Sequence, residues 1–157
     1  MPSAPLIDLT SLDLTRLVMT RDEIYAKLPH RFEFMQLDGI VHIDHEQRIG
    51  VGLRIVREDE FWVRGHIPGR PLMPGVLMIE AAAQMASVLS MELLTQEGFL
   101  GFGGVDAVKF RKTVEPPATM YIVEKVVDLR RRRTICDAQS FVNGELVFEG
   151  RITGMQV

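Results

Sequence analysis

The sequence predicts an α+β domain in which an antiparallel sheet wraps around one long helix. Residues 75–95 form one apolar segment of helical length, whose few polar residues do not make a full solvent-facing side. Residues 39–57 and 105–157 consist of short strand-like runs separated by turn residues, about six strands in total. A helix that is apolar nearly all round must be buried on most sides, and a curled sheet supplies that burial.

A short helix is predicted ahead of the sheet, over residues 20–28. Thr20 and Glu23 have the spacing of a capping box, in which each residue satisfies a free backbone N–H of the other. Pro29 then ends the helix, because proline cannot donate the hydrogen bond that a continuing helix needs. Residues 1–19 show no consistent period, and we predict an N-terminal arm there that is helical only in part.

The strand segments are delimited by turn signals. Residues 39–57 predict two strands joined by a polar turn at residues 44–47. Asn143 and Gly144 lie between the last two strands and predict a type I′ hairpin turn. Residues 98–104 hold four glycines and are predicted to be a break between the long helix and the strands that follow.

Composition and charge narrow the class of protein. The 157 residues are 46% hydrophobic and 25% charged, which is typical of one globular domain, predicted over residues 20–157. The formal net charge of −3 argues against general binding of nucleic acid or anionic membrane. Asp8 and Asp13 interrupt the N-terminal apolar residues, so we expect no signal peptide, and no uninterrupted apolar run reaches roughly 18 residues. The single cysteine, Cys136, fits a reducing compartment, and we expect a cytoplasmic protein.

The long helix carries one carboxylate among apolar neighbours. Glu80, Gln84 and Ser87 are spaced i, i+4 and i+7, and therefore form one polar stripe. An ionised carboxylate is costly to desolvate, so Glu80 must be paired, reach water or take up a proton. A carboxyl group tuned by burial can deliver a proton near neutral pH. The alternative is that the stripe is the solvent-facing edge of the helix.

A histidine precedes this helix in a segment stiffened by proline. His66 is held in a conformationally restricted loop, whose glycines and prolines are Gly65, Pro68, Gly69, Pro71 and Pro74. Gly75 begins the helix, where free N–H groups and the positive end of the helix dipole favour a developing oxyanion. An imidazole base, a carboxyl acid and an oxyanion donor together suit proton abstraction next to a carbonyl. The alternative for His66 is an ordinary surface position in a turn.

Three sequence blocks, in order, resemble one enzyme family. "GHIPGRPLMPGVLMIEAAAQ" (65–84) resembles G-H-F-P-G-x-P-x-x-P-G-V-L-x-x-E-A-x-A-Q, including the spacing from histidine to glutamate. "LPHRFEFMQLD" (28–38) and "FGGVDAVKFRKTV" (102–114) resemble two further blocks of the same family. The resemblance spans roughly residues 20–155. The family that these blocks resemble is the FabZ type of β-hydroxyacyl-ACP dehydratases.

The resemblance implies a hot-dog fold, a homodimer with active sites at the subunit interface, and assembly of three dimers into a hexamer as is common in the family. It implies reversible dehydration of (3R)-3-hydroxyacyl thioesters to trans-2-enoyl thioesters in fatty acid biosynthesis, without a metal or redox cofactor. His66 of one subunit would remove the C2 proton, and Glu80 of the other would protonate the departing hydroxyl. The Gly75 N–H would bind the thioester oxygen, and Gln84 would orient Glu80 or serve only as a buried hydrogen-bonding residue.

The substrate of this family is carried by the acidic acyl carrier protein. Arg111, Lys112 and Arg70 flank the matching blocks and could steer that partner, with Arg111 favoured because it belongs to the KFR match. The alternative is that they are ordinary solvated charges. Two other functions remain open: a hot-dog acyl thioesterase, with Glu80 activating water, or a non-catalytic acyl-binding accessory subunit.

Some residues depart from the family pattern near the expected acyl channel. Trp62, Ile67 and Gly101 replace residues usual in the family, which leaves the preferred chain length open. His30 lies within the LPHR match, and we predict for it a structural role in bonding the backbone of its loop.

Overall fold

One curved antiparallel sheet forms the framework of the chain. The computed structural model describes residues 2–95 and 98–157. Within these ranges the sheet has seven strands in the order β1-β2-β3-β5-β6-β7-β4. Their bounds are β1 Met19–Thr20, β2 Gly39–Asp44, β3 Ile49–Val56, β4 Leu100–Phe110, β5 Ala118–Leu129, β6 Arg133–Val142 and β7 Glu145–Gln156. The predicted α+β architecture is confirmed, with the very short β1 added to the expected strands.

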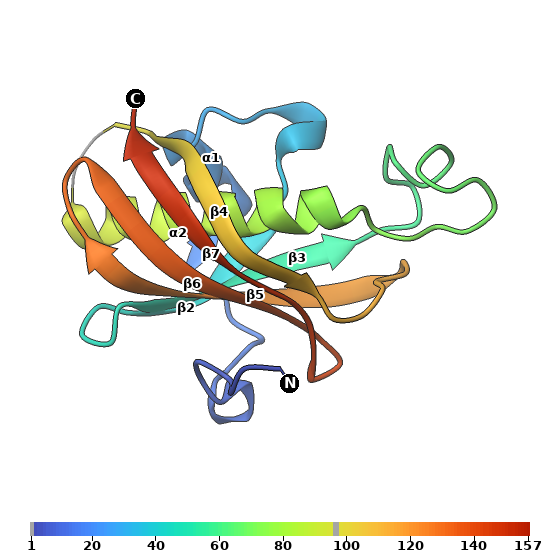
Figure 1. Cartoon of the computed structure of the whole chain (residues 1–157), viewed down its shortest axis with the longest axis horizontal. Helices are drawn as coiled ribbons and strands as arrows, with labels where there is room; N and C mark the ends of the chain where they lie inside the picture. Colours follow the sequence, from blue (N-terminus) through green and yellow to red (C-terminus); the bar gives the residue numbers. More distant parts are fainter. Residues whose placement is uncertain (1, 96–97) are drawn as a thin grey trace.

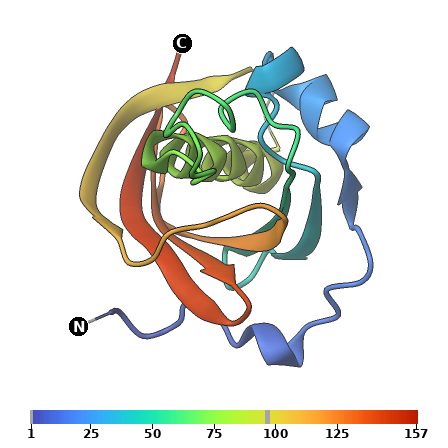
Figure 2. The ribbon, with the colours of Figure 1, turned by 90° about the vertical axis from the view of Figure 1, so that its right-hand side faces the viewer.

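The long helix α2, Gly75–Leu94, lies inside the curve of the sheet, as Figure 2 shows in a view along the helix. Its Met78, Ala82, Met85 and Leu89 pack into a core shared with the inward-facing residues of the strands. The helix has the length and mean hydropathy, 1.4, of a membrane-spanning segment, although 61% of that window is buried inside this domain. Burial in the core therefore explains its apolar character.

The short helix α1, Arg21–Lys27, begins with the predicted capping box. The Thr20 N–H donates to the Glu23 carboxylate at 2.8 Å, and the Glu23 N–H donates to the Thr20 hydroxyl at 3.3 Å. Leu28 is extended and precedes Pro29, as predicted. The helix lies beside β1 and β2 at one edge of the sheet, and the chain continues from it through a short 3-10 helix, η2 (Phe32–Phe34), into β2 (Figure 1).

The turn predictions are confirmed at residues 44–47, between β2 and β3, and at Asn143 and Gly144, and are wrong at residues 98–104. Asn143 and Gly144 both have positive φ, 51° and 75°, as a type I′ turn requires. The expected glycine-rich break is wrong, because β4 already begins at Leu100. A Cβ on Gly103 would lie 2.3 Å from Cγ of Met155 on β7. Glycine there allows close pairing of two strands.

The N-terminal arm crosses the outer face of the sheet (Figure 1). It contains a short 3-10 helix, η1, at Leu9–Ser11. Its apolar side chains cover an outer cluster on β2, β3, β5 and β6; those packed there include Leu6, Ile7, Leu9, Leu12 and Leu14. Gln139 on β6 fixes the crossing, because it accepts from the Leu6 N–H at 2.8 Å and donates to the Ala4 carbonyl at 2.9 Å.

Candidate active site

The amide of Gln84 is the centre of a buried network around Glu80. Its oxygen accepts from the Tyr25 hydroxyl at 2.7 Å and from the Gln36 N–H at 3.2 Å. Its nitrogen donates to the Phe34 carbonyl at 2.7 Å and to Oε1 of Glu80 at 2.8 Å. Because a backbone N–H can only donate and a carbonyl can only accept, these groups fix which way the amide points. Oε1 of Glu80 therefore receives an N–H group.

The polar stripe of α2 does not form the solvent edge of the helix. Gln84 is 1% exposed and Ser87 is 5% exposed. The Ser87 hydroxyl donates to the Leu100 carbonyl at 3.0 Å, which joins α2 to the start of β4. The Glu80 side chain retains 25% exposure and is therefore the member of the stripe that remains open to a ligand.

His30 lies beside Glu80, which sequence reasoning missed. Its Nε2 is 3.3 Å from Oε1 of Glu80, and its Nδ1 is buried without a hydrogen-bond partner in the part of the chain that the structure describes. The predicted bond to the loop backbone is thus replaced by a contact with the carboxylate. Burial lowers the pKa of His30, although the charge of Glu80 partly opposes this shift. The imidazole is accordingly neutral near neutral pH. In the sequence, the position of His30 within the LPHR block was the feature that could have indicated a place near the active site.

His66 is held by the carbonyl at the end of its own loop. Its Nδ1 lies 2.8 Å from the Leu72 carbonyl, and its backbone N–H donates to the Trp62 carbonyl at 2.9 Å. A carbonyl can only accept, so Nδ1 carries the proton and Nε2 presents a lone pair. Trp62 is itself buried in the core, at 4% exposure. The ring of His66 is thus oriented as a base while the residue remains exposed.

Ion pairs anchor the start of this loop. Arg54 on β3 is buried and pairs with Glu60, whose other oxygen accepts from the Arg57 N–H at 3.0 Å. Arg57 in turn pairs with Asp38 at 2.8 Å. These contacts tie the chain leaving β3 back to the sheet, and hold the segment that delivers His66.

Gly75 begins α2 without a side-chain cap. Its N-cap residue is Pro74, and the Leu77 N–H returns to the Pro74 carbonyl at 3.0 Å. In the described ranges, no acceptor is bonded to the N–H of Gly75, so it stays available to a ligand oxygen. A Cβ here would meet the ring of Phe110 at 2.8 Å. Glycine therefore lets the end of β4 pack against the first turn of α2.

The two predicted catalytic side chains are not bonded to each other within residues 2–95 and 98–157 of one chain. No hydrogen bond or ion pair joins His66 to Glu80 in the part of the chain that the structure describes. Among the strands that the structure describes, β4 pairs with β7 and with no other strand, so one of its edges is open. It exposes Phe102 at 49%, Val105 at 36% and Phe110 at 51%. An unpaired, apolar edge strand of this length is a template for pairing with another chain.

The three predicted partner-binding residues differ in their surroundings. Arg111 is partly buried, at 23% side-chain exposure, and its Nε lies 3.3 Å from Glu149. Lys112 is more exposed and pairs with Glu145 at 2.7 Å. Arg70 lies exposed in the His66 loop. Arg111 thus stabilises the sheet in addition to any contact with a partner.

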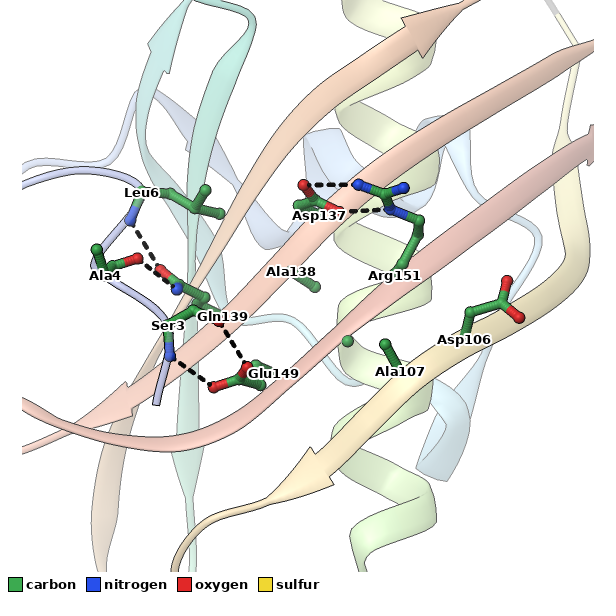
Figure 3. A pocket seen from close by; sticks show the side chains of 11 residues that line it. Ser3, Ala4, Leu6, Asp106, Ala107, Asp137, Ala138, Gln139, Glu149 and Arg151 are labelled. Atoms are coloured by element: carbon green, nitrogen blue, oxygen red, sulfur yellow. Dashed lines mark hydrogen bonds and ion pairs between the residues drawn. The ribbon is translucent and has the colours of Figure 1, made fainter. Parts of the chain in front are cut away.

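A separate hollow of about 320 Å³ lies on the outer face of the sheet, beneath the N-terminal arm (Figure 3). Figure 3 shows Arg151 bridging to Asp137, with bonds of 2.7 and 3.1 Å. Glu149 accepts from the Ser3 hydroxyl at 2.8 Å. Because these charged groups are engaged with one another and no candidate catalytic residue lines the hollow, we place the candidate site at Glu80 instead.

The structure combines a helix wrapped by an antiparallel sheet with a carboxyl group, an oriented imidazole and a helix N-terminus that has no side-chain cap. These features are shared with one family of proteins. A family model described as a FabA-like domain matches residues 28–151. The chain belongs to this family, and within it to the FabZ-type dehydratases. It is 38% identical over 136 residues to a protein of Roseiflexus sp. (strain RS-1) named 3-hydroxyacyl-[acyl-carrier-protein] dehydratase FabZ, covering 86% of this chain and 94% of that protein. An equally named protein of Clostridioides difficile (strain 630) is 37% identical over 132 residues, covering 83% and 92%.

Solved structures share the fold at low sequence identity. A chain of the dehydratase heterocomplex ApeI:P from Xenorhabdus doucetiae has a TM-score of 0.72 at 17% identity, covering 85% of this chain and 90% of that chain. A hypothetical thioesterase from Streptococcus pneumoniae, solved with coenzyme A, has a TM-score of 0.59 at 13% identity, covering 75% and 84%. The hot-dog fold is thereby confirmed.

Proposed function

We propose that this chain catalyses the reversible dehydration of (3R)-3-hydroxyacyl thioesters, carried by acyl carrier protein, to trans-2-enoyl thioesters in fatty acid biosynthesis. The relatives named for this reaction align along most of their own length, which supports the proposal. The observation that carries it is the oriented carboxyl of Glu80 on α2, held by the fully bonded amide of Gln84.

In the proposed reaction, Nε2 of His66 removes the proton from C2 of the acyl chain. This role is supported by the bond from Nδ1 to the Leu72 carbonyl, which leaves Nε2 as the basic nitrogen. Glu80 gives its proton to the 3-hydroxyl, which leaves as water. The N–H of Gly75 stabilises the thioester oxygen while it acquires enolate character. Gln84 holds the acid in place and does not touch the substrate.

The proposed active site is shared by two copies of the chain in a homodimer, with His66 from one subunit and Glu80 from the other. The lack of contact between the two side chains within one chain supports this arrangement, as does the open apolar edge of β4. Antiparallel pairing of β4 with its copy would satisfy the free backbone groups of that edge. Further assembly of three dimers into a hexamer is part of the proposal by family resemblance.

The acidic carrier protein would dock near Arg70, Arg111 and Lys112, since these cations lie on or beside the segments that deliver the site. A cytoplasmic location is proposed with it, supported by the single cysteine, Cys136, which is buried and unpaired. Salt should weaken the apparent affinity for the carrier-bound substrate more than that for a small thioester, because surface charges are screened.

An assay of enoyl thioester absorbance tests the activity. With (3R)-3-hydroxyacyl thioesters as substrates, absorbance should rise for the wild-type chain and fall to background for His66→Ala and Glu80→Gln, while both variants keep the wild-type circular dichroism spectrum. Release of free thiol is measured in parallel. Thiol release without enoyl formation would overturn the dehydratase proposal in favour of a thioesterase, and binding without either product would favour a non-catalytic subunit.

A further inference from the structure

Two nitrogen groups converge on the same oxygen of Glu80. Gln84 donates to Oε1 at 2.8 Å, and Nε2 of His30 lies 3.3 Å from the same atom, just beyond the roughly 2.7–3.2 Å typical of N–H···O bonds. In the described part of the chain, Oε2 has no corresponding partner. The two carboxyl oxygens of Glu80 therefore have different surroundings before any substrate binds.

The surroundings of His30 determine which of its nitrogens carries the proton. Nδ1 is buried and has no hydrogen-bond partner among residues 2–95 and 98–157. A proton on Nδ1 would leave a buried donor unsatisfied and would set the lone pair of Nε2 against the carboxylate, which is the costlier arrangement. The neutral ring therefore carries its proton on Nε2, the nitrogen that lies 3.3 Å from Oε1. An edge contact with Phe99, at 5.7 Å between ring centroids, helps hold this orientation.

We propose that His30 is a positioning residue for Glu80, which together with the hydrogen bond from Gln84 places two N–H groups beside Oε1 and so confines the transferable proton of Glu80 to Oε2. This inference rests on the proposed dehydratase function. An oxygen that accepts one N–H group and lies beside a second is a poor place for an acidic proton, because that proton would meet both donor hydrogens. Oε2 is then the oxygen that faces the departing hydroxyl.

The proposal predicts which half of the elimination depends on His30. In the hydroxy substrate, His66 takes the C2 proton, C2 and C3 form the double bond, and the C3–O bond breaks as Glu80 protonates the leaving oxygen to give water. In a 3-chloroacyl thioester of the same configuration, the C3–Cl bond breaks and chloride leaves with its electron pair, without needing a proton. Elimination from the chloro substrate therefore does not need the proton of Glu80, but it still needs removal of the C2 proton by His66.

His30→Phe and His30→Gln are the test variants. Phenylalanine keeps a ring against Phe99 but has no donor, whereas the glutamine amide can place an N–H where Nε2 of His30 lies. Both are assayed with the 3-hydroxybutyryl thioester and its 3-chloro analogue on the same thiol, with the non-enzymatic elimination of chloride subtracted. Thermal unfolding of each variant shows whether the fold is kept.

His30→Phe should lose about ten- to a hundred-fold in kcat on the hydroxy substrate, with KM changed little. Its rate on the chloro substrate should stay near the wild-type rate, and His30→Gln should recover most of the loss. Equal losses on both substrates, or no loss on either, would overturn the positioning role. If the wild-type chain itself formed no enoyl product from the hydroxy substrate, the proposed function would fail instead.

Discussion

Gln84 donates a hydrogen bond of 2.8 Å to Oε1 of Glu80, one helical turn before it on α2. The amide that makes this bond is itself fixed by Tyr25, Gln36 and Phe34. The hydroxyl of Tyr25 also accepts from the Leu37 N–H at 2.8 Å. The position of the carboxyl is therefore set by the loop before β2 as much as by the helix.

Replacing Gln84 by leucine should both destabilise the chain and slow the reaction. Buried backbone groups of Gln36 and Phe34 would lose their partner, and we expect the free energy of unfolding to fall by about 2–4 kcal/mol. Urea unfolding measures this, and enoyl formation should fall by at least about ten-fold in kcat. Tyr25→Phe is the matched control: it removes the hydroxyl that donates to Gln84 and accepts from the Leu37 N–H, and it should cost less because Gln84 keeps its other three partners. A leucine variant as stable and as active as the wild type would show that the network does not hold Glu80.

Dimer formation through β4 predicts the effect of a charge on its exposed edge. Phe102→Glu places a carboxylate where an apolar side chain is 49% exposed, so the dimer should dissociate and enoyl formation should be lost with the fold kept. Val127→Glu, at a position 43% exposed on β5, is the control and should leave the dimer intact. Sedimentation equilibrium reports both masses. If the Phe102→Glu variant remains an active dimer, the proposal that the dimer forms through the open edge of β4 is wrong.

Glu124 predicts an unusual dependence of stability on pH. It lies on β5 and is fully buried, and neither of its carboxyl oxygens has a hydrogen-bond partner within the described residues. Burial holds the pKa of Glu124 well above its ordinary value, and the charge of Asp137 raises it further. Between the ordinary and the raised pKa, the folded chain keeps a proton that the unfolded chain releases. The free energy of unfolding should therefore fall as pH rises through this window.

Glu124→Met tests this account, because it keeps the side-chain volume and removes the unpaired carboxyl. The variant should be more stable than the wild type by about 1–3 kcal/mol near neutral pH, with a smaller gain at pH values below the ordinary carboxyl pKa. Glu115→Gln removes an exposed carboxyl and is the control. Urea unfolding at a series of pH values gives the comparison. A gain that does not change with pH would contradict the buried, protonated state of Glu124.

Local signals in the sequence predicted most of the fold. The capping box at Thr20 and Glu23, the hairpin turn at Asn143 and the buried helix over residues 75–95 depend on neighbours within a few positions, and all are found. The strand through Gly103 was missed, since its glycine allows close contact with Met155, a partner far along the chain. Glycine alone does not separate a loop from such a contact.

The site was predictable in its residues but not in its geometry. The block from His66 to Glu80 named the candidate acid and base, and their chemistry follows from residue type. The contact of His30 with Glu80 depends on where the loop before β2 crosses α2, which no spacing in the sequence encodes. Equally, only the structure shows that His66 and Glu80 do not pair within one chain.

The most direct measurement of the central claim mixes the inactive His66→Ala and Glu80→Gln chains. Subunits are exchanged by mild dilution or low urea, with exchange followed by a mass tag on one chain, and enoyl formation is then assayed. If each site takes its histidine from one subunit and its glutamate from the other, every mixed dimer regains one intact site, and about a quarter of wild-type activity should return in an equal mixture. Full exchange with no return of activity would contradict the shared site.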